Sequence, residues 1–144
     1  MIYLCRHSET VWNREGRLQG HKNSELTARG EAQARRMGEA FKRKIDGIDD
    51  YQLIASPLSR TRKTAEIVCE VIGRDHDKIT LDDRLMEISW GEWEGFTRPE
   101  IEARWPGIYD RRRENKWEFC PPSGESYALL SERVGDWLKD CRLY

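Results

Sequence analysis

Two short apolar runs, each followed at once by polar residues, place the strongest constraint on the fold of this chain. Residues 1–5 read Met-Ile-Tyr-Leu-Cys and lead directly into Arg6-His7, and residues 51–55 lead into Ser56-Pro57. Runs of this kind are typical of buried strands, and a helical pattern follows each of them along the chain. The order strand, helix, strand, helix predicts a parallel sheet covered by helices. We expect an α/β fold with three α/β/α layers and a mostly parallel central sheet, formed as a single domain over residues 1–144.

Apolar residues at helical spacing define the expected helices. These helices are predicted over residues 27–45, 58–72, 97–105 and 126–141. Thr27 and Ser126 suit the N-cap position, and Gly73 suits the end of the second helix. The inner face of the last helix is expected to consist of Leu129, Leu130, Val134 and Trp137. Residues 12–26 show no clear period and are interpreted as a loop, and residues 79–81 are interpreted as a minor strand.

The balance of charges argues against a nucleic-acid or membrane partner. The chain has 25 basic and 26 acidic side chains and a net charge of −1, so no overall field would attract an anionic polymer or lipid surface. Arg111, Arg112 and Arg113 stand beside acidic residues and are interpreted as a solvated loop, with recognition of an anionic substrate as the alternative. No apolar run approaches the roughly 20 residues that a membrane span requires.

The N-terminus and the cysteines indicate a cytoplasmic protein. Residues 1–9 lack the basic region and apolar core of a signal peptide. The four cysteines form no C-x-x-C pair, which argues against a zinc site or a redox pair. Cys5 and Cys69 lie in apolar stretches and are expected to be buried thiols. Unpaired thiols are typical of a reducing compartment.

Two arginines and a histidine follow the predicted strands in positions that suit phosphoryl chemistry. Arg6 and His7 come directly after the first strand, and Arg60 lies in the first turn of the helix after the second strand. The carboxyl ends of parallel strands meet at one edge of a sheet, so these side chains are expected to lie close together. Guanidinium forks match phosphoryl oxygens, the nearby helix N-terminus adds partial positive charge, and an imidazole can attack phosphorus.

Glu87 is the best candidate for the group that protonates the leaving oxygen. It stands among apolar neighbours in Leu85-Met86-Glu87-Ile88, which would raise the pKa of its carboxyl. A carboxylic acid that stays neutral near pH 7 can act as a general acid. Glu92 and Glu94 are weaker alternatives. A structural interpretation, in which Glu87 is a buried carboxyl paired with Arg84, stays open.

Six short motifs give the chain a resemblance to a known family. In order along the sequence they are Leu4-Cys5-Arg6-His7-Ser8-Glu9-Thr10, Gly16-Arg17-Leu18-Gln19-Gly20, Leu26-Thr27-x-x-Gly30-x-x-Gln33-Ala34, Ser56-Pro57-Leu58-x-Arg60-x-x-x-Thr64-Ala65, Gly91-Glu92-Trp93-Glu94-Gly95 and Gly124-Glu125-Ser126. The set resembles the histidine phosphatase superfamily, which includes the cofactor-dependent phosphoglycerate mutases. Each motif alone is weak, but their common order over residues 2–140 is specific.

The resemblance implies a role for each candidate residue. His7 would be the nucleophile, Arg6 and Arg60 would hold the phosphoryl group, and Glu87 would be the proton donor. Asn13, Gln19 and Gly20 would lie near the phosphate or the substrate. No metal or other cofactor is implied, because arginines and a helix end supply the positive charge. The expected partner is a small phosphorylated molecule, and a homodimer stays open.

Two departures from the family pattern affect these expectations. Ser8 stands where glycine usually follows the histidine, so the backbone has less room near a ligand. The family pattern also continues with another strand after the last helix, which ends in a second His that completes the phosphate pocket. This chain ends at Tyr144, and His21 and His76 match no such position. We therefore expect a truncated product or an incomplete record of a longer chain, with exposed apolar surface beside the first strand.

The expected activity is hydrolysis of a small phosphomonoester through a phosphohistidine. Phosphoglycerate mutase activity is the alternative. The segment between Gly95 and Gly124 is shorter than the insertion typical of such mutases, which favours a site open to water. A non-catalytic phosphate-binding module or an inactive fragment also stays open, because the second His is missing from the sequence.

Overall fold

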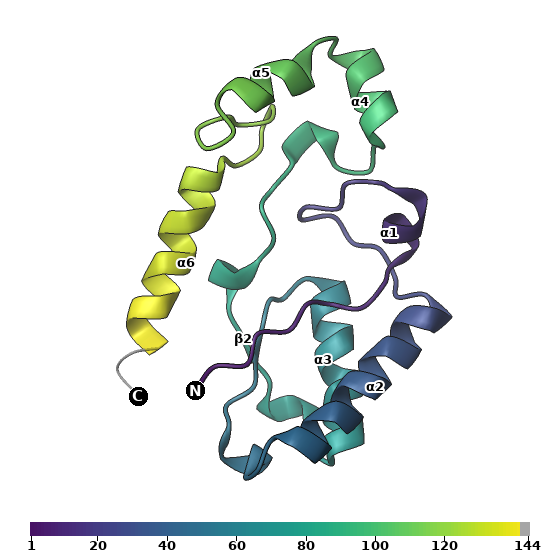
Figure 1. The fold of residues 1–144 in the computed structure, drawn as a ribbon, viewed down its shortest axis with the longest axis vertical. Helices are drawn as coiled ribbons and strands as arrows, with labels where there is room; N and C mark the ends of the chain where they lie inside the picture. The colour runs from purple at the N-terminus through teal and green to yellow at the C-terminus, as the bar shows by residue number, and fades with distance from the viewer. Residues whose placement is uncertain (142–144) are drawn as a thin grey trace. The chain divides into compact units, whose positions relative to one another are not determined.

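A computed structural model describes residues 1–141 and divides the chain into two compact units (Figure 1). Unit 1 consists of residues 1–11 and 23–83, and unit 2 consists of residues 12–22 and the chain from Arg84 onward. Each unit therefore contains one N-terminal stretch and one longer, later stretch of the sequence. No helix of the described residues is long and apolar enough to cross a membrane.

Unit 1 is an α/β unit built on a small parallel sheet. Strand β1 (Ile54–Ala55) leads into helix α3 (Ser59–Ile72), and β2 (Thr80–Leu81) pairs with β1 in parallel, with Ile54 opposite Thr80. The parallel strand–helix–strand order agrees with the prediction. Helix α2 (Ala28–Lys44) packs against α3, as Figure 1 shows, and two short 3-10 turns, η1 (Ile48–Asp50) and η2 (His76–Lys78), complete the unit.

The ends of α2 and α3 follow from local sequence. The hydroxyl of Thr27 accepts a 3.0 Å hydrogen bond from the N–H of Gly30, so Thr27 caps α2 as predicted. Helix α3 ends at Gly73, whose φ of +79° is left-handed. The buried apolar residues of this unit come mainly from α2, β1 and α3, and they are Ala34, Ile45, Ala55, Leu58, Ile67, Val68, Cys69 and Ile72.

Residues 1–5 do not form the buried strand that their apolar sequence predicts. No strand is assigned there, and Met1 and Leu4 are 92% and 96% exposed. A strand needs a hydrogen-bonded neighbour. The first β-bridge along the chain comes only at Thr10, which pairs with Leu26 in an isolated antiparallel bridge. Ile2 and Tyr3 are exposed as well, so this segment presents apolar surface. Cys5 is exposed as well, contrary to expectation.

Unit 2 is largely helical and has an aromatic core. Its elements are α1 (Val11–Glu15), which starts at the boundary with unit 1, the 3-10 turns η3 (Asp83–Leu85) and η4 (Gly91–Trp93), and the helices α4 (Arg98–Arg104), α5 (Ile108–Glu114) and α6 (Tyr127–Cys141). Trp93, Ile101 and Ile108 form the buried centre, against which Trp90 and Tyr109 pack. Thr97 and Glu100 form a capping box at the start of α4.

Three predictions in unit 2 are wrong. Residues 11–15 form a short helix instead of a loop, because five residues are too few to show a period. Arg111–Arg113 belong to the last turn of α5, where Arg113 pairs with Asp110 across 2.6 Å. The predicted inner face of α6 is wrong for Leu129, which is 48% exposed, whereas Leu130, Val134 and Trp137 are half-buried.

Candidate active site

The hydrogen bond of His7 defines which ring nitrogen can act as a nucleophile. Nδ1 of His7 lies 2.7 Å from the main-chain carbonyl oxygen of Ser8. A carbonyl oxygen only accepts, so Nδ1 must carry the proton in this contact. In the neutral ring the lone pair is then on Nε2. The hydrogen bond therefore selects the tautomer of the half-buried His7 that is protonated on Nδ1.

The segment around His7 is attached to the start of α2 by Glu9. The N–H of Glu9 donates to Oε1 of Gln33 at 2.9 Å, and its carbonyl oxygen accepts from the N–H of Thr27 at 3.0 Å. The hydroxyl of Thr27 also donates to the Glu9 carboxylate at 2.8 Å. Gly30 lies against the carbonyl oxygen of Glu9 so closely that a side chain has no room. The motif Leu-Thr-x-x-Gly-x-x-Gln therefore positions the loop that carries His7.

A second connection joins this loop to the helix that carries Arg60. The N–H of Ser8 donates to the hydroxyl of Thr64 at 3.1 Å, and that hydroxyl donates to the carbonyl oxygen of Arg60 at 2.8 Å. Ser8, Thr64 and Arg60 are all buried, and Arg60 is only 1% exposed. The structure thus brings the main chain beside His7 to the first turns of α3.

The two arginines differ in their surroundings. Arg60 is buried in the first turn of α3, whereas Arg6 is exposed. The first turn of α3 contains no acidic residue, so the partial positive charge of the helix N-terminus is not offset within its own turn. Its first N–H, on Ser59, donates to the side-chain oxygen of Asn23 at 3.4 Å. This end of α3 therefore suits an anion on electrostatic grounds.

Glu87, the expected proton donor, belongs to unit 2 and is exposed. The apolar surroundings predicted for its carboxyl are therefore wrong, because Ile88, and not Glu87, points into the core. One carboxylate oxygen of Glu87 accepts a hydrogen bond of 3.3 Å from the indole N–H of Trp90. The carbonyl oxygen of Glu87 accepts from Nε2 of His21 at 2.8 Å.

Gln19 and Gly20 lie in a loop that is held by Glu94. Glu94 is buried, and its Oε1 accepts from the N–H of His21 at 2.9 Å and from the N–H of Trp90 at 3.1 Å. Gly20 has a φ of +54° and approaches this carboxylate too closely for any side chain. Gln19 is buried as well. Glu94 thus serves to join the Gly20–His21 turn to the segment that follows Glu87.

Asn13 belongs to helix α1 in unit 2. It is exposed there, and its main-chain carbonyl oxygen accepts a hydrogen bond from the N–H of Gly16 at 3.3 Å. The assigned roles of Asn13, Gln19 and Gly20 near a substrate stay predictions. Within residues 1–141, no group of three or more His, Cys, Asp or Glu side chains is placed to hold a metal ion.

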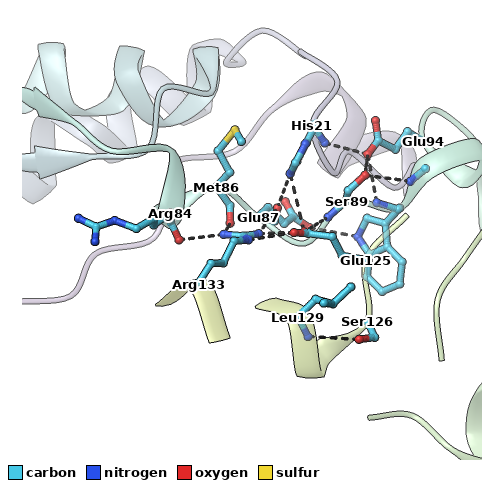
Figure 2. A network of polar contacts seen from close by, with 12 residues as sticks. His21, Arg84, Met86, Glu87, Ser89, Glu94, Glu125, Ser126, Leu129 and Arg133 are labelled. Carbon is cyan, nitrogen blue, oxygen red and sulfur yellow. Dashed lines mark hydrogen bonds and ion pairs between the residues drawn. The ribbon is translucent and has the colours of Figure 1, made fainter. Parts of the chain in front are cut away.

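A polar network supports the loop of residues 84–89, here called the acid loop (Figure 2). Arg133 of α6 donates to the carbonyl oxygens of Arg84 and Met86 at 2.8 and 2.7 Å and to that of Glu87 at 3.0 Å. Its guanidinium also forms two bonds with the carboxylate of Glu125, at 3.0 and 2.9 Å. Glu125 in turn accepts from the N–H of Ser89 at 2.8 Å.

Sequence reasoning did not identify Arg133 and His21 as members of this region. Glu125 was noticed only as part of a helix start, and His21 only as a histidine without a matching position. One signal was available, since Gly20 precedes His21 in a recognised motif and Glu125 precedes α6 in another. The partners of Arg133, however, lie 46–49 positions away in sequence for its carbonyl contacts, so no local pattern reveals them.

The comparisons with known proteins identify the family of this chain. The family described as the histidine phosphatase superfamily (branch 1) matches residues 2–143. The chain belongs to the histidine phosphatase superfamily, a family of enzymes. "Probable phosphoglycerate mutase GpmB" of Salmonella arizonae is 39% identical over 140 residues, and the protein of the same name from Citrobacter koseri is 40% identical over 148 residues. The matches cover 97% of this chain and 62% of each relative, so this chain spans less than two thirds of their length.

Solved structures share the fold. The mycobacterial glucosyl-3-phosphoglycerate phosphatase, solved with VO3, superimposes with a TM-score of 0.79 at 28% identity, over 93% of this chain and 63% of that chain. The alpha-ribazole phosphatase from Shigella flexneri gives a TM-score of 0.82 over 96% of this chain and 65% of that chain, and at 24% identity this likeness concerns the fold alone. The fold is therefore the α/β fold of the phosphoglycerate mutase-like proteins, as predicted.

Proposed function

We propose that this chain hydrolyses a small phosphomonoester through a phosphohistidine at His7. The observation that carries the proposal is the hydrogen bond from Nδ1 of His7 to the carbonyl oxygen of Ser8, because it directs the lone pair to Nε2. Nε2 attacks phosphorus, a P–N bond forms, and the bond from phosphorus to the ester oxygen breaks. Water then attacks the phosphohistidine, and inorganic phosphate leaves.

In this proposal, the arginines stabilise negative charge and Glu87 transfers protons. Arg60, buried in the first turn of α3, and Arg6 stabilise the phosphoryl oxygens in the transition state. Glu87 gives its proton to the departing ester oxygen. The Glu87 carboxylate then takes a proton from the attacking water, so that proton transfer balances over one turnover.

The named relatives support phosphoryl chemistry and favour two reactions. The solved mycobacterial relative is a glucosyl-3-phosphoglycerate phosphatase, and the curated relatives carry the name phosphoglycerate mutase. A mutase is therefore the second candidate. In the described part of the chain, the segment between Gly95 and Gly124 holds the helices α4 and α5. So short a segment favours transfer to water over return of the phosphoryl group to a bound glycerate. A coupled assay of phosphoglycerate interconversion separates the two reactions.

The first experiment measures release of nitrophenol from p-nitrophenyl phosphate, with phosphoenzyme trapped in parallel. The His7→Ala variant is expected to lose both turnover and an acid-labile phosphohistidine. His76→Ala serves as the matched control, because His76 lies exposed in η2 of the same unit and contacts only Glu70, at 4.0 Å, among the ion pairs. If a folded chain binds inorganic phosphate but forms no phosphohistidine, it is a non-catalytic phosphate-binding module and the proposal fails.

A further inference from the structure

The guanidinium of Arg133 is directed at main-chain carbonyl groups of the acid loop. It reaches the carbonyl oxygens of Arg84, Met86 and Glu87, all at 3.0 Å or less, while its Nε and Nη2 bond to the two carboxylate oxygens of Glu125 (Figure 2). These contacts use Nε and both terminal nitrogens of the side chain. The side chain is 19% exposed, so it lies largely out of solvent.

Such a contact pattern needs arginine. The guanidinium presents five N–H groups in a planar fork of fixed geometry, whereas a lysine ammonium is a point charge with three donors. The Arg133 fork satisfies carbonyl oxygens on one side and a carboxylate on the other at the same time. Bonds of a charged donor are also stronger than neutral ones. Lysine at this position therefore keeps the positive charge but cannot form the same set of hydrogen bonds to the carbonyl oxygens and the Glu125 carboxylate.

Two further contacts restrict the same loop. Nε2 of His21 donates to the carbonyl oxygen of Glu87 at 2.8 Å and lies 4.0 Å from the Glu125 carboxylate. Glu125 and Ser89 exchange main-chain and side-chain bonds, since the N–H of Glu125 donates to the Ser89 carbonyl at 2.9 Å and the Ser89 N–H donates to the Glu125 carboxylate at 2.8 Å. The acid loop is thus held at residues 84, 86, 87 and 89.

These contacts restrain the main chain of Glu87, and Trp90 bonds to its carboxylate. Arg133 and His21 both bond to the carbonyl oxygen of Glu87, whereas the carboxylate receives the indole N–H of Trp90 at 3.3 Å. The two main-chain contacts and the Trp90 contact together restrain the direction of this exposed residue. A general acid is effective only when it is held within hydrogen-bond reach of the proton acceptor.

We propose that Arg133, braced by Glu125, is a positioning residue that orients Glu87 for proton transfer to the leaving group. The inference rests on the proposed function, in which Glu87 is the acid. It assigns Glu125, which precedes α6, a task beyond the helix start, because Glu125 joins the fork of Arg133 to the N–H of Ser89. It predicts that loss of the fork affects the substrates that need a proton on the leaving oxygen.

The test compares substrates with different leaving groups. The dinitrophenolate of dinitrophenyl phosphate leaves without being protonated, whereas the phenolate of phenyl phosphate needs a proton to leave. For Arg133→Lys, kcat/KM is expected to fall by ~10- to 100-fold with phenyl phosphate, the range that a small misplacement of a catalytic group costs, and by much less with dinitrophenyl phosphate. Glu87→Gln should show the same selectivity. Arg113→Lys, at an exposed arginine of α5 that pairs with Asp110, is the matched control and should change neither value.

A second measurement follows the loop itself by hydrogen exchange. In Arg133→Lys and in Glu125→Gln, the amide of Ser89 should exchange faster than in the parent chain, with the thermal transition of the fold retained. An equal loss of kcat/KM for both phosphates, or an unchanged Ser89 amide, would overturn the positioning role. A parent chain with a protected Ser89 amide but no phosphohistidine would instead overturn the proposed function, and this inference with it.

Discussion

The main-chain N–H of Ser8 donates a 3.1 Å hydrogen bond to the hydroxyl of Thr64, and both residues are buried. The same hydroxyl donates to the carbonyl oxygen of Arg60 at 2.8 Å. The hydroxyl of Thr64 therefore forms hydrogen bonds with two main-chain groups, the N–H of Ser8 and the carbonyl oxygen of Arg60, which lie far apart in the sequence. Since Ser8 follows His7 directly, this bond also fixes the position of the candidate nucleophile relative to α3.

Replacement of Thr64 by valine is expected to destabilise unit 1. Thr64→Val keeps the shape of the side chain but leaves the buried N–H of Ser8 without its acceptor, which costs about 1–3 kcal/mol. Thr64→Ser keeps the hydroxyl and loses one methyl group, for about 0.8 kcal/mol. Urea denaturation measures both. A neutral Thr64→Val beside a destabilising Thr64→Ser would show that the methyl group, and not the hydroxyl, matters at this position.

Gly30→Ala should reverse the usual preference for alanine in a helix. Alanine normally stabilises a helix interior by about 1 kcal/mol over glycine. At Gly30, however, the added methyl group meets the carbonyl oxygen of Glu9, and overpacking costs about 1–3 kcal/mol. Gly135 in α6 is the control, because nothing lies within 4 Å of a methyl group added there. Thermal melts should place Gly30→Ala below the parent protein and Gly135→Ala at or above it.

The helices could be predicted from sequence because their ends depend on neighbouring residues. Thr27, Gly73 and the Thr97–Glu100 box act within one helical turn, and the observed bounds of α2, α3 and α4 follow them closely. The strands could not be bounded in the same way. A strand is defined by a partner that is distant in sequence, so residues 1–5 look apolar and extended yet stay exposed.

The candidate site shows the same division between local and distant causes. His7 and Arg60 could be chosen because each comes within a few residues of the end of an apolar run. The Thr64 contacts bring their segments together. The apolar neighbours of Glu87 in the sequence predict apolar surroundings, but the side chain of Ile88 is buried while that of Glu87 is exposed. Its actual partners, His21 and Arg133, come from far along the chain.

Ser8→Ala should be neutral or stabilising, in contrast to most changes of a buried polar residue. Ser8 is 4% exposed, and its hydroxyl has no hydrogen-bond partner within residues 1–141, which costs free energy in the folded state. Removal of this oxygen is expected to raise the free energy of unfolding by up to ~1 kcal/mol. Ser126→Ala is the matched control, because the equally buried Ser126 accepts from the N–H of Leu129 at 3.2 Å. The loss of this cap should cost about 1 kcal/mol. A marked destabilisation by Ser8→Ala would contradict the account of Ser8.

Glu125 is expected to make stability depend on pH in the acid range. Burial raises the pKa of its carboxyl, but the hydrogen bonds from Arg133 and the Ser89 N–H, with the charges of Arg133 and His21, outweigh burial and lower the pKa from its ordinary value. A carboxyl whose pKa is lower in the folded state releases its proton more readily there than in the unfolded chain. Its contribution to stability is therefore complete above the unfolded pKa of about 4.3 and is lost as the pH falls through the folded pKa.

The measurement is the free energy of unfolding from neutral pH down into this range, for the parent chain and for Glu125→Gln. The variant should be less stable at neutral pH by about 1.5–3 kcal/mol, as for other hydrogen bonds to charged groups, and its stability should fall less steeply on acidification. Arg133→Met removes the main source of the lowered pKa and should flatten the same part of the curve. Since the two side chains form one bidentate contact, the double variant should lose less than the two single losses combined. Additive losses would mean that Glu125 and Arg133 stabilise the acid loop independently.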